Sequence, residues 1–489
     1  MSSRASISKP PKGVSARRSF VFLCLFMTPF FAVGLFFLYA GIQNWLSGNS
    51  TAGMAVCGFA TVFLLFSSGF LFMGWHGFQR GRKQEQLEVV HAEEPWLWRE
   101  DWATGVIRSA GKGTVWFAWV IALFWNGISS PLLFVFSREW EKGNKLILIG
   151  LIFPLIGLLI LVWAIYRTVQ YRKFGQSLFR MLSVPGVLGG SLSGAVEVPS
   201  KVRADKGFKL RLHCVQRTTT GSGKNRSTHE QLLWEDEKTI LRDLLEHERG
   251  RTAIPVHFNI PYELPSSLEG NPAIVWRLEI LADIPGVDYS AQFEVPVFKT
   301  PQSDPERQPA EDPTAAFQPP PQEYQPPAKS RIQARDIFDG VELYFPAARN
   351  PGGIAALLVF LAIWNAIFWV LMVKKAPIIF PIVWGLADTI LMLALLSALF
   401  YSVRVQATKS QLSVYHRMLF PTCTRRLPSS EIKSVQARPG AQAGRTVYYQ
   451  IRVQTRDGKE YHAGEGIPDR RHAEWLASRI ATALGVNSK

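Results

Sequence analysis

The stretch Trp119–Phe136, WVIALFWNGISSPLLFVF, contains no charged residue and lies within a longer uncharged run, Val115–Phe136. A second uncharged run, Leu146–Tyr166, follows after the short polar turn SREWEKGN. A helix rises about 1.5 Å per residue, so roughly 20 apolar residues span the hydrocarbon core of a bilayer. Both runs reach that length, and the sequence therefore predicts a transmembrane helical hairpin.

The same pattern recurs in LVFLAIWNAIFWVLMV, residues 358–373. Each copy has a Trp-Asn pair in its first helix, a Phe-Pro pair at the start of its second helix, and an Arg-Met-Leu triplet beyond it. The matched elements are Trp125-Asn126, Phe153-Pro154 and Arg180-Met181-Leu182 in the first copy, and Trp364-Asn365, Phe380-Pro381 and Arg417-Met418-Leu419 in the second. We interpret this as one hairpin used twice, with a different soluble domain attached to each copy.

This duplication predicts where the polar residues of the bundle lie. An amide that faces lipid leaves its hydrogen bonds unmade where no water competes, so Asn126 and Asn365 should face other helices. The two hairpins should pack together around a pseudo-symmetric contact, with Asp388 on the same inner face. Each Phe-Pro pair should lie in or near the first turn of its helix, where proline removes no intrahelical hydrogen bond.

Two further pairs of uncharged runs complete six predicted spans. Phe20–Ile42 and Gly53–Trp75 form the first hairpin, and Gly352–Val373 and Ile378–Tyr401 form the third. The run Phe20–Ile42 exceeds the apolar core of a secretory signal, which has about 7–15 residues, so we expect it to be retained. The fold class is therefore a six-span helical bundle with a cytoplasmic all-β sandwich and a small α+β C-terminal domain.

The distribution of basic residues sets the predicted orientation, because Lys and Arg are retained on the cytoplasmic side. With both termini inside, nearly all of the 54 Lys and Arg lie inside. The exceptions are Arg138, Lys142, Lys145, Lys374 and Lys375. The tight Lys374-Lys375 turn breaks the rule locally, and we expect its side chains to snorkel to phosphates. The four cysteines form no CxxC pair, which indicates a reducing compartment. The predicted location is the bacterial inner (plasma) membrane.

The predicted organisation has eight parts. They are a basic cytoplasmic N-terminus (1–19), a first transmembrane hairpin (20–75), a Trp-rich cytoplasmic loop (76–113), a second hairpin (114–166), a basic collar and β-sandwich (167–300), a Pro-rich linker (301–335), a third hairpin (336–401) and a C-terminal domain (402–489). The linker has almost no aliphatic residues, so we expect it to be extended or disordered. Cations in the collar are expected to contact anionic lipid headgroups.

The loop sequence EEPWLWREDWATGVIR places Trp96, Trp98 and Trp102 among charged residues. Tryptophan favours the membrane interface, where its ring is buried and its N–H stays hydrated. The segment is interpreted as an interfacial helix packed under the bundle, and the alternative is a partner-docking or ligand-gating element.

Residues 184–300 contain short runs that alternate apolar and polar residues, which favours an antiparallel sandwich. The runs IPVHFNIP (254–261), IVWRL (274–278) and ADIPGVD (282–288) resemble one half of an arrestin-like sandwich, a class of domain that binds proteins. The C-terminal LPSSEIKSVQ, YYQIRVQTRDGKEY and AEWLASRIATALG resemble a bacterial pleckstrin-homology-like domain. The whole chain resembles uncharacterised bacterial inner-membrane proteins that combine such spans and domains.

Two functional hypotheses follow. The first is a membrane-anchored interaction, assembly or sensing module whose sandwich recruits a cytoplasmic protein. The second is a transporter or channel that uses Asp388, since an ionisable residue inside a span is by default a functional candidate. A hydrogen bond from Asn365 or Asn126 is the structural alternative for Asp388.

The sequence has no P-loop, GxSxG, HExxH or zinc-ligand spacing. We therefore expect no enzymatic activity, no cofactor, no catalytic residue and no metal site. Aromatic residues are not arranged for stacking on bases, so no nucleic-acid partner is expected. The expected partners are the lipid bilayer and a cytoplasmic protein, and homo-oligomerisation is left open.

Overall fold

The computed structural model describes residues 16–109, 111–143, 150–220, 227–244, 250–307, 311–320, 324–327, 330–373, 379–418, 423–443 and 446–488. The chain divides into two compact units, Met1–Pro320 and Pro321–Lys489. The Lys374-Lys375 turn, for which snorkelling was expected, lies outside the described residues.

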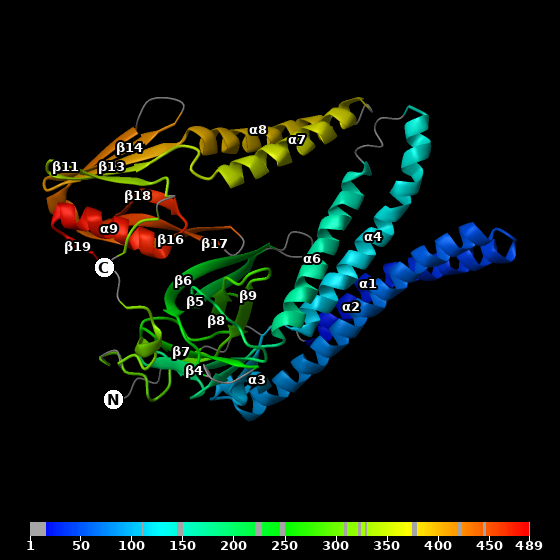
Figure 1. The fold of residues 1–489 in the computed structure, drawn as a ribbon, viewed down its shortest axis with the longest axis horizontal. Coiled ribbons are helices and arrows are strands. Elements are labelled where there is room, and N and C mark those ends of the chain that lie inside the picture. The colour runs from blue at the N-terminus through cyan, green and yellow to red at the C-terminus, as the bar shows by residue number, and fades with distance from the viewer. Residues whose placement is uncertain are drawn as a thin grey trace. The chain divides into compact units, whose positions relative to one another are not determined.

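Each unit contains long apolar helices that are candidates for spanning a membrane (Figure 1). In the first unit they are α1 (Ala16–Leu46), α2 (Ser50–Val90), α4 (Lys112–Glu141) and α6 (Ile152–Phe174), and in the second α7 (Pro351–Val373) and α8 (Ile379–Phe400). Within the described residues, five helices are long and apolar enough to cross a bilayer. The span expected at Val115–Phe136 lies within α4 and is not among the five, so the sixth span stays a prediction.

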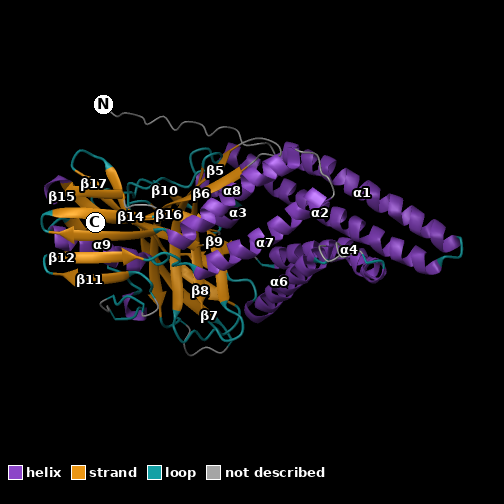
Figure 2. Cartoon of the chain, turned by 90° about the horizontal axis from the view of Figure 1, so that it is seen from above, coloured by secondary structure: helices purple, strands orange, loops and turns teal. Residues whose placement is uncertain are grey.

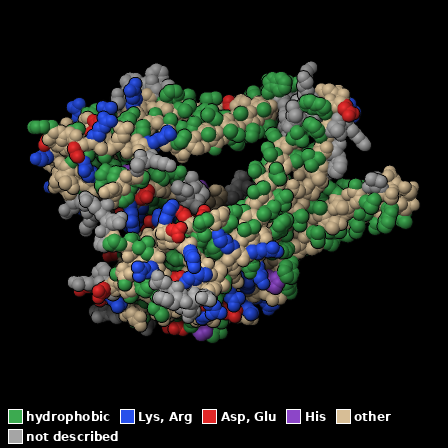
Figure 3. Space-filling model, in the orientation of Figure 1, with side chains coloured by type: hydrophobic (Ala, Val, Ile, Leu, Met, Phe, Trp, Pro, Cys, Tyr) green, Lys and Arg blue, Asp and Glu red, His purple; other side chains and the backbone are tan. Residues whose placement is uncertain are grey.

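The outer surfaces of these helices carry hydrophobic side chains, which are green in Figure 3. Phe22 and Leu25 on α1, for example, are about 70% exposed in the protein alone. Apolar residues gain nothing from water, so a surface of this kind fits lipid. Helices α1 and α2 approach closely at Gly41, where a Cβ atom would lie 2.6 Å from the sulfur of Cys57. Small residues permit this distance between membrane helices.

Two four-stranded antiparallel sheets, ordered β1-β2-β4-β7 and β6-β5-β8-β9, form the two-sheet domain of the first unit. Their strands are β1 (Val106–Arg108), β2 (Leu178–Met181), β4 (Ser191–Val198), β5 (Phe208–Thr220), β6 (Ser227–Ile240), β7 (Thr252–Asn259), β8 (Ala273–Ala282) and β9 (Tyr289–Glu294), and β3 (Gly186–Val187) pairs with β10 (Val297–Phe298). Both sheets contribute to one hydrophobic core, with Phe179 from the first and Trp276 from the second. The alternation expected in β5 is confirmed for Leu210, Leu212 and Cys214, which are buried.

The C-terminal domain of the second unit combines a five-stranded sheet, β11 to β15 in chain order, with a sheet ordered β18-β17-β16-β19. The elements are β11 (Gln333–Ile337), β12 (Gly340–Phe345), β13 (Ser402–Thr408), β14 (Gln411–Arg417), β15 (Cys423–Pro428), β16 (Ile432–Ala443), β17 (Thr446–Thr455), β18 (Glu460–Ile467), α9 (Arg470–Leu484) and β19 (Asn487–Ser488). Figure 2 shows α9 beside these strands. One face of α9 is apolar, and Ala473, Leu476 and Ile480 on that face lie in the core. Asp469 caps its first turn.

Both soluble domains receive a helical hairpin between two strands that pair with each other. In the first unit, α4 and α6 separate β1 from β2, and Arg108 lies opposite Leu178. In the second unit, α7 and α8 separate β12 from β13, and Phe345 lies opposite Val403. The duplication inferred from the Trp-Asn and Phe-Pro pairs therefore extends to the connections between strands.

This arrangement differs from the expected boundaries in three places. Strands β11 and β12 belong to the C-terminal domain, although residues 336–401 were expected to form only the third hairpin. Strand β1 belongs to the two-sheet domain, although residues 76–113 were expected to form only a loop. Helix α2 also continues beyond the expected end at Trp75. Strand pairing across an inserted hairpin joins segments that are distant in sequence, so local patterns did not reveal it.

Part of the expected disordered linker is folded. A short helical turn, η3 (Ala315–Phe317), packs on the two-sheet domain, and the backbone N–H of Leu241 donates to the carbonyl of Phe317. Lys238 pairs with Asp312. Burial favours the neutral acid, but hydrogen bonds from Lys238 and Thr314 hold the pKa of Asp312 below its usual range. These contacts offset the ordering entropy that the linker composition alone could not.

The C-terminal domain should fold without its hairpin but not without β11 and β12. A chain of residues 324–489 in which a short Gly-Ser loop replaces Pro351–Phe400 should give a cooperative thermal melt by circular dichroism. The paired ends of β12 and β13 lie within a few ångströms, so a short loop can join them. Residues 402–489 alone lack the buried Leu343 and Phe345 and should remain unfolded and protease-sensitive. A cooperative melt of that shorter chain would contradict the assignment.

Candidate functional site

The two Trp-Asn pairs connect the helices of their own hairpins in the same way. Each asparagine amide nitrogen donates to the carbonyl four residues earlier and to a group on the partner helix. The acceptors are Ala122 O at 2.8 Å and Gly157 O at 2.9 Å for Asn126, and Leu361 O and Asp388 Oδ1, both at 3.0 Å, for Asn365. Both amides thus satisfy their donors inside protein, as membrane burial requires.

Neighbouring tryptophans reinforce each hairpin. The indole N–H of Trp125 donates to the carbonyl of Phe153 at 2.9 Å. Trp364 stacks on Trp384 with ring centroids 4.0 Å apart. As expected, Pro154 lies in the first turn of α6, and Pro381 lies in the first described turn of α8.

The expected contact of both asparagines with other helices is therefore confirmed within each hairpin. The meeting of Asn365 and Asp388, considered from sequence as the structural alternative for Asp388, is observed. The two hairpins belong to different units, so their mutual packing stays a prediction.

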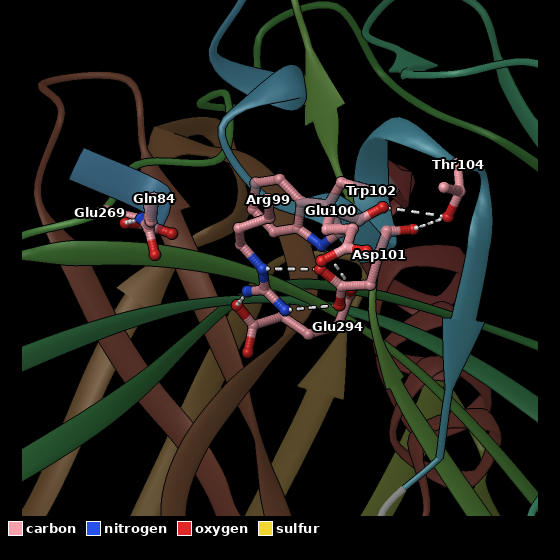
Figure 4. A network of polar contacts seen from close by, with 8 residues as sticks. All are labelled: Gln84, Arg99, Glu100, Asp101, Trp102, Thr104, Glu269 and Glu294. Carbon is pink, nitrogen blue, oxygen red and sulfur yellow. Dashed lines mark hydrogen bonds and ion pairs between the residues drawn. The ribbon is translucent and has the colours of Figure 1, made fainter. Parts of the chain in front are cut away.

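A polar cluster joins the Trp-rich segment to β9 (Figure 4). The segment contains η1 (Pro95–Leu97) and the single turn α3 (Glu100–Ala103). The guanidinium of Arg99 donates to Glu294 at 2.6 Å and to Asp101 at 2.9 Å. Burial disfavours the charged guanidinium, but hydrogen bonds and charge from Asp101 and Glu294 outweigh it and raise the pKa of Arg99. Gln84 on α2 also donates to Glu269 of the two-sheet domain.

The three tryptophans of this segment have different surroundings. Trp102 is 4% exposed in the core of the two-sheet domain, and its indole N–H donates to the carbonyl of Glu294 at 3.0 Å. Trp96 packs on the same core beside Phe298. Trp98 donates to the carbonyl of His91 within its own segment. The Trp102 ring therefore belongs to a domain core, and placement of the segment at the membrane interface stays a prediction.

Helix α6 is fastened to the two-sheet domain where it ends. Gly175 follows the helix with φ at 71°, a conformation that glycine adopts without strain. The Lys173 ammonium donates to the carbonyls of Pro285 and Val287, at 3.1 and 3.3 Å. The Gln170 amide donates to the carbonyl of Asp288 at 3.0 Å. The hairpin thus holds both β2 and the loop before β9.

A small cavity lies at this junction. It is lined by residues from the start of α4, from the end of α6 and from β9, including Ser109, Arg167, Gln170, Tyr171 and Ser290. Within it, the guanidinium of Arg167 donates to Gln170 at 2.7 Å. Its described lining contains an arginine and no carboxylate. The sequence suggested a basic collar here but gave no sign of a cavity.

A ladder of charged side chains crosses β6, β5 and β8. Arg211 donates to Glu237 at 2.7 Å, and Glu230 accepts from both Arg217 and Arg277. Opposite charges on neighbouring strands stabilise a sheet by a few tenths of a kcal/mol to about 1 kcal/mol per pair. The alternation of charges in KLRLHCVQR and EQLLWEDEK could have signalled this ladder.

His213 sits in the ladder and is uncharged at neutral pH. Burial lowers the pKa of His213 to about 4, although Glu279 opposes this shift and Arg211 adds to it. The approach of its Nε2 to Glu279, at 3.9 Å, is therefore not an ion pair near pH 7.

Among the described residues, no cluster of three or more His, Cys, Asp or Glu side chains could hold a metal ion. The polar groups found at the hairpins and at the domain junction form structural hydrogen bonds and ion pairs. Their arrangement can hold helices and sheets in fixed positions.

No known family and no curated protein matches the chain. Solved structures that it is similar to include the sporulation control protein Spo0M from Bacillus subtilis, with 10% identity, 52% of this chain and 90% of that chain covered, and a TM-score of 0.19. Another is the alkylpurine DNA glycosylase AlkC from Pseudomonas fluorescens, bound to DNA containing an abasic site analogue. The two chains are 12% identical, the match covers 54% of this chain and 76% of the AlkC chain, and the TM-score is 0.13. At these scores, neither likeness carries an argument about fold or function.

Replacing Trp102 with alanine should destabilise the two-sheet domain by about 3 kcal/mol, because it removes a large buried ring and leaves a cavity. The measurement is the urea midpoint for proteolysis of the full chain in detergent. Trp98→Ala is the matched control and should shift the midpoint less, since Trp98 contacts its own segment. Equal shifts would contradict the assignment of Trp102 to the domain core.

Stability should fall as the pH drops below the ordinary histidine range. The unfolded chain takes up a proton on His213 near pH 6.5, whereas the folded chain resists this until about pH 4. The contribution of neutral His213 to stability is therefore fully present above about pH 6.5 and is lost as the pH falls toward about 4. His213→Gln should flatten the pH dependence of Tm in detergent, and His229→Gln, at an exposed position of β6, should not. Identical slopes for both variants would refute this role.

Proposed function

We propose that this protein is a membrane-anchored interaction module. Its hairpins hold an arrestin-like sandwich and a pleckstrin-homology-like domain at the cytoplasmic face of a bacterial inner membrane. The sandwich there recruits a cytoplasmic protein. The observation that carries the proposal is the insertion of a helical hairpin between two paired strands in each domain.

A hairpin inserted in this way anchors a domain more firmly than a flexible tether would. Helix α6 ends at Phe174 and β2 begins at Leu178, so little chain separates the membrane-like helix from the sheet. Lys173 and Gln170 add hydrogen bonds to the loop before β9. Arg99 and Trp102 add a second attachment from the α2 side. Such a domain presents a fixed face to a partner, which reduces the ordering cost of binding.

The contacts of Asp388 support a structural role in place of transport. Its carboxylate accepts a hydrogen bond from Asn365 across the hairpin. Asn126 makes the corresponding cross-hairpin bond in the first unit without any acidic partner. Because a cross-hairpin hydrogen bond from asparagine occurs in both hairpins, helix packing explains it. Interhelical hydrogen bonds of this type contribute about 1 kcal/mol.

The β5–β6 ribbon is the proposed partner-binding part of the sandwich. Strand β5 pairs with β8 only as far as Arg217, whereas its pairing with β6 continues to Thr220. The ribbon therefore extends beyond the sheet, and His229 near its end is exposed. Backbone groups of an extended ribbon give a partner both hydrogen bonds and side chains to contact.

The test is site-specific photo-crosslinking of the full chain in cells. A crosslinking amino acid at His229 should give a discrete protein adduct, and the same amino acid at Tyr166, on the lipid-like surface of α6, should not. The variant Asp388→Asn should leave the adduct unchanged. The proposal fails if His229 gives no adduct while Asp388→Asn abolishes an ion flux measured in liposomes.

A further inference from the structure

We propose that Arg17 on α1 and Arg82 on α2 together bind the phosphate of an anionic lipid. Helices α1 and α2 run in opposite directions, so the start of α1 lies beside the part of α2 that follows Trp75. This inference concerns a ligand of the membrane anchor and does not depend on any protein partner of the sandwich.

A cluster of three aromatic rings joins the two helices at this end. The Phe20 ring stacks on Phe78 with centroids 5.3 Å apart, and it meets the edge of Trp75 at 5.7 Å. The helices approach closely here, since a Cβ atom on Gly74 would overlap the side chain of Leu23. Ring contacts of this kind stabilise helix packing, and they fix which residues of α1 and α2 lie at the same level.

The two arginines lie one helical turn beyond the stacked rings. Arg17 precedes Phe20 by three residues on α1, and Arg82 follows Phe78 by four residues on α2. Residues three or four apart share one face of a helix, so both arginines are on the side of the Phe20–Phe78 contact. The Arg82 guanidinium lies 5.8 Å from the centre of the Phe78 ring. Because the helices are antiparallel, both arginines lie at the same end of the ring pair.

These guanidinium groups are available to an anion. Arg17 and Arg82 are exposed, as are Arg80 and Lys83 beside Arg82 on α2. Within the described residues, no hydrogen bond or ion pair joins any of these side chains to a carboxylate. Helix α1 has no acidic residue in its first turn, and the N-terminus of a helix carries partial positive charge. Like charges gathered in this way repel one another, and a bound anion relieves the repulsion.

The apolar surfaces of the two helices place the arginines at the level of lipid headgroups. The part of α1 that is apolar enough to span a membrane begins at Phe20, and the uncharged run of α2 ends at Trp75. The run from Gly53 to Trp75 is roughly 34 Å long as a helix, enough to cross the hydrocarbon core. Since Phe20 and Trp75 are in contact, both helices leave the apolar region at one level. Arg17 and Arg82 follow immediately outside it.

The surface beside the arginines favours a lipid over free phosphate. Phe22 on α1 and Phe72 and Trp75 on α2 are 70%, 61% and 47% exposed in the protein alone. A phosphate that carries acyl chains can place those chains on this apolar surface while its charge meets the guanidinium groups. The planar fork of N–H donors on a guanidinium matches the oxygens of a phosphate. A free phosphate gains nothing from the apolar surface.

The test measures lipid binding to the full chain in a neutral detergent by native mass spectrometry. Phosphatidylglycerol should bind, and phosphatidylcholine should not displace it. The double variant Arg17→Gln with Arg82→Gln should weaken phosphatidylglycerol binding by about tenfold, because it removes both charge-assisted contacts to the phosphate. The matched control, Lys409→Gln with Arg456→Gln, removes the same charge from exposed turns after β13 and β17. It should leave binding nearly unchanged.

The proposal fails on any of three results. Equal loss of binding in the two double variants would show that diffuse charge, not the arginine pair, attracts the lipid. Displacement of phosphatidylglycerol by excess inorganic phosphate would show that the site takes free phosphate. If the Arg17 and Arg82 double variant does not fold, Arg82→Gln alone provides the test, with an expected loss of about threefold. Unchanged phosphatidylglycerol binding in the variant tested would reject the site.

Discussion

The backbone ladder between the strands that flank each inserted hairpin is the interaction on which the rest of this structure depends. Inside a membrane, the backbone polar groups must be satisfied within each helix, and in the soluble domains they are satisfied across strands. The change from one scheme to the other occurs within a few residues, between Phe174 and Leu178 and between Phe400 and Ser402. So little chain separates helix from strand that, within each unit, the sheet is held in a fixed position relative to the helices.

The polar groups inside the hairpins serve the same end. Asn126 reaches a backbone carbonyl of α6, and Asn365 reaches the carboxylate of Asp388 on α8. Each bond fixes the register of two apolar helices, which packing of similar side chains would leave weakly defined. An acidic residue inside a span therefore has a structural explanation in this chain.

Local patterns predicted the apolar runs and the alternation seen in β5, because each depends on neighbours close in sequence. They could not predict that β12 pairs with β13, since a whole hairpin lies between them. Trp102 was expected at a membrane interface because an indole suits any boundary between apolar and polar surroundings. Its partner, Glu294, is distant in sequence. The cavity beside Arg167 likewise draws on three separate segments, and none of them alone indicates a hollow there.

The interrupted sheets also determine when each soluble core can form during synthesis of the chain. Strand β12 is synthesised before α7 and α8, and β13 is synthesised after them. The buried residues of β12, including Leu343 and Phe345, can pair with β11 at once, but they reach their second neighbouring strand, β13, only after the whole hairpin has been synthesised. The same sequence of events applies to β1 and β2 around α4 and α6. Completion of each soluble core therefore requires that the inserted helices have been made, and a chain whose synthesis stops early keeps an unpaired strand edge.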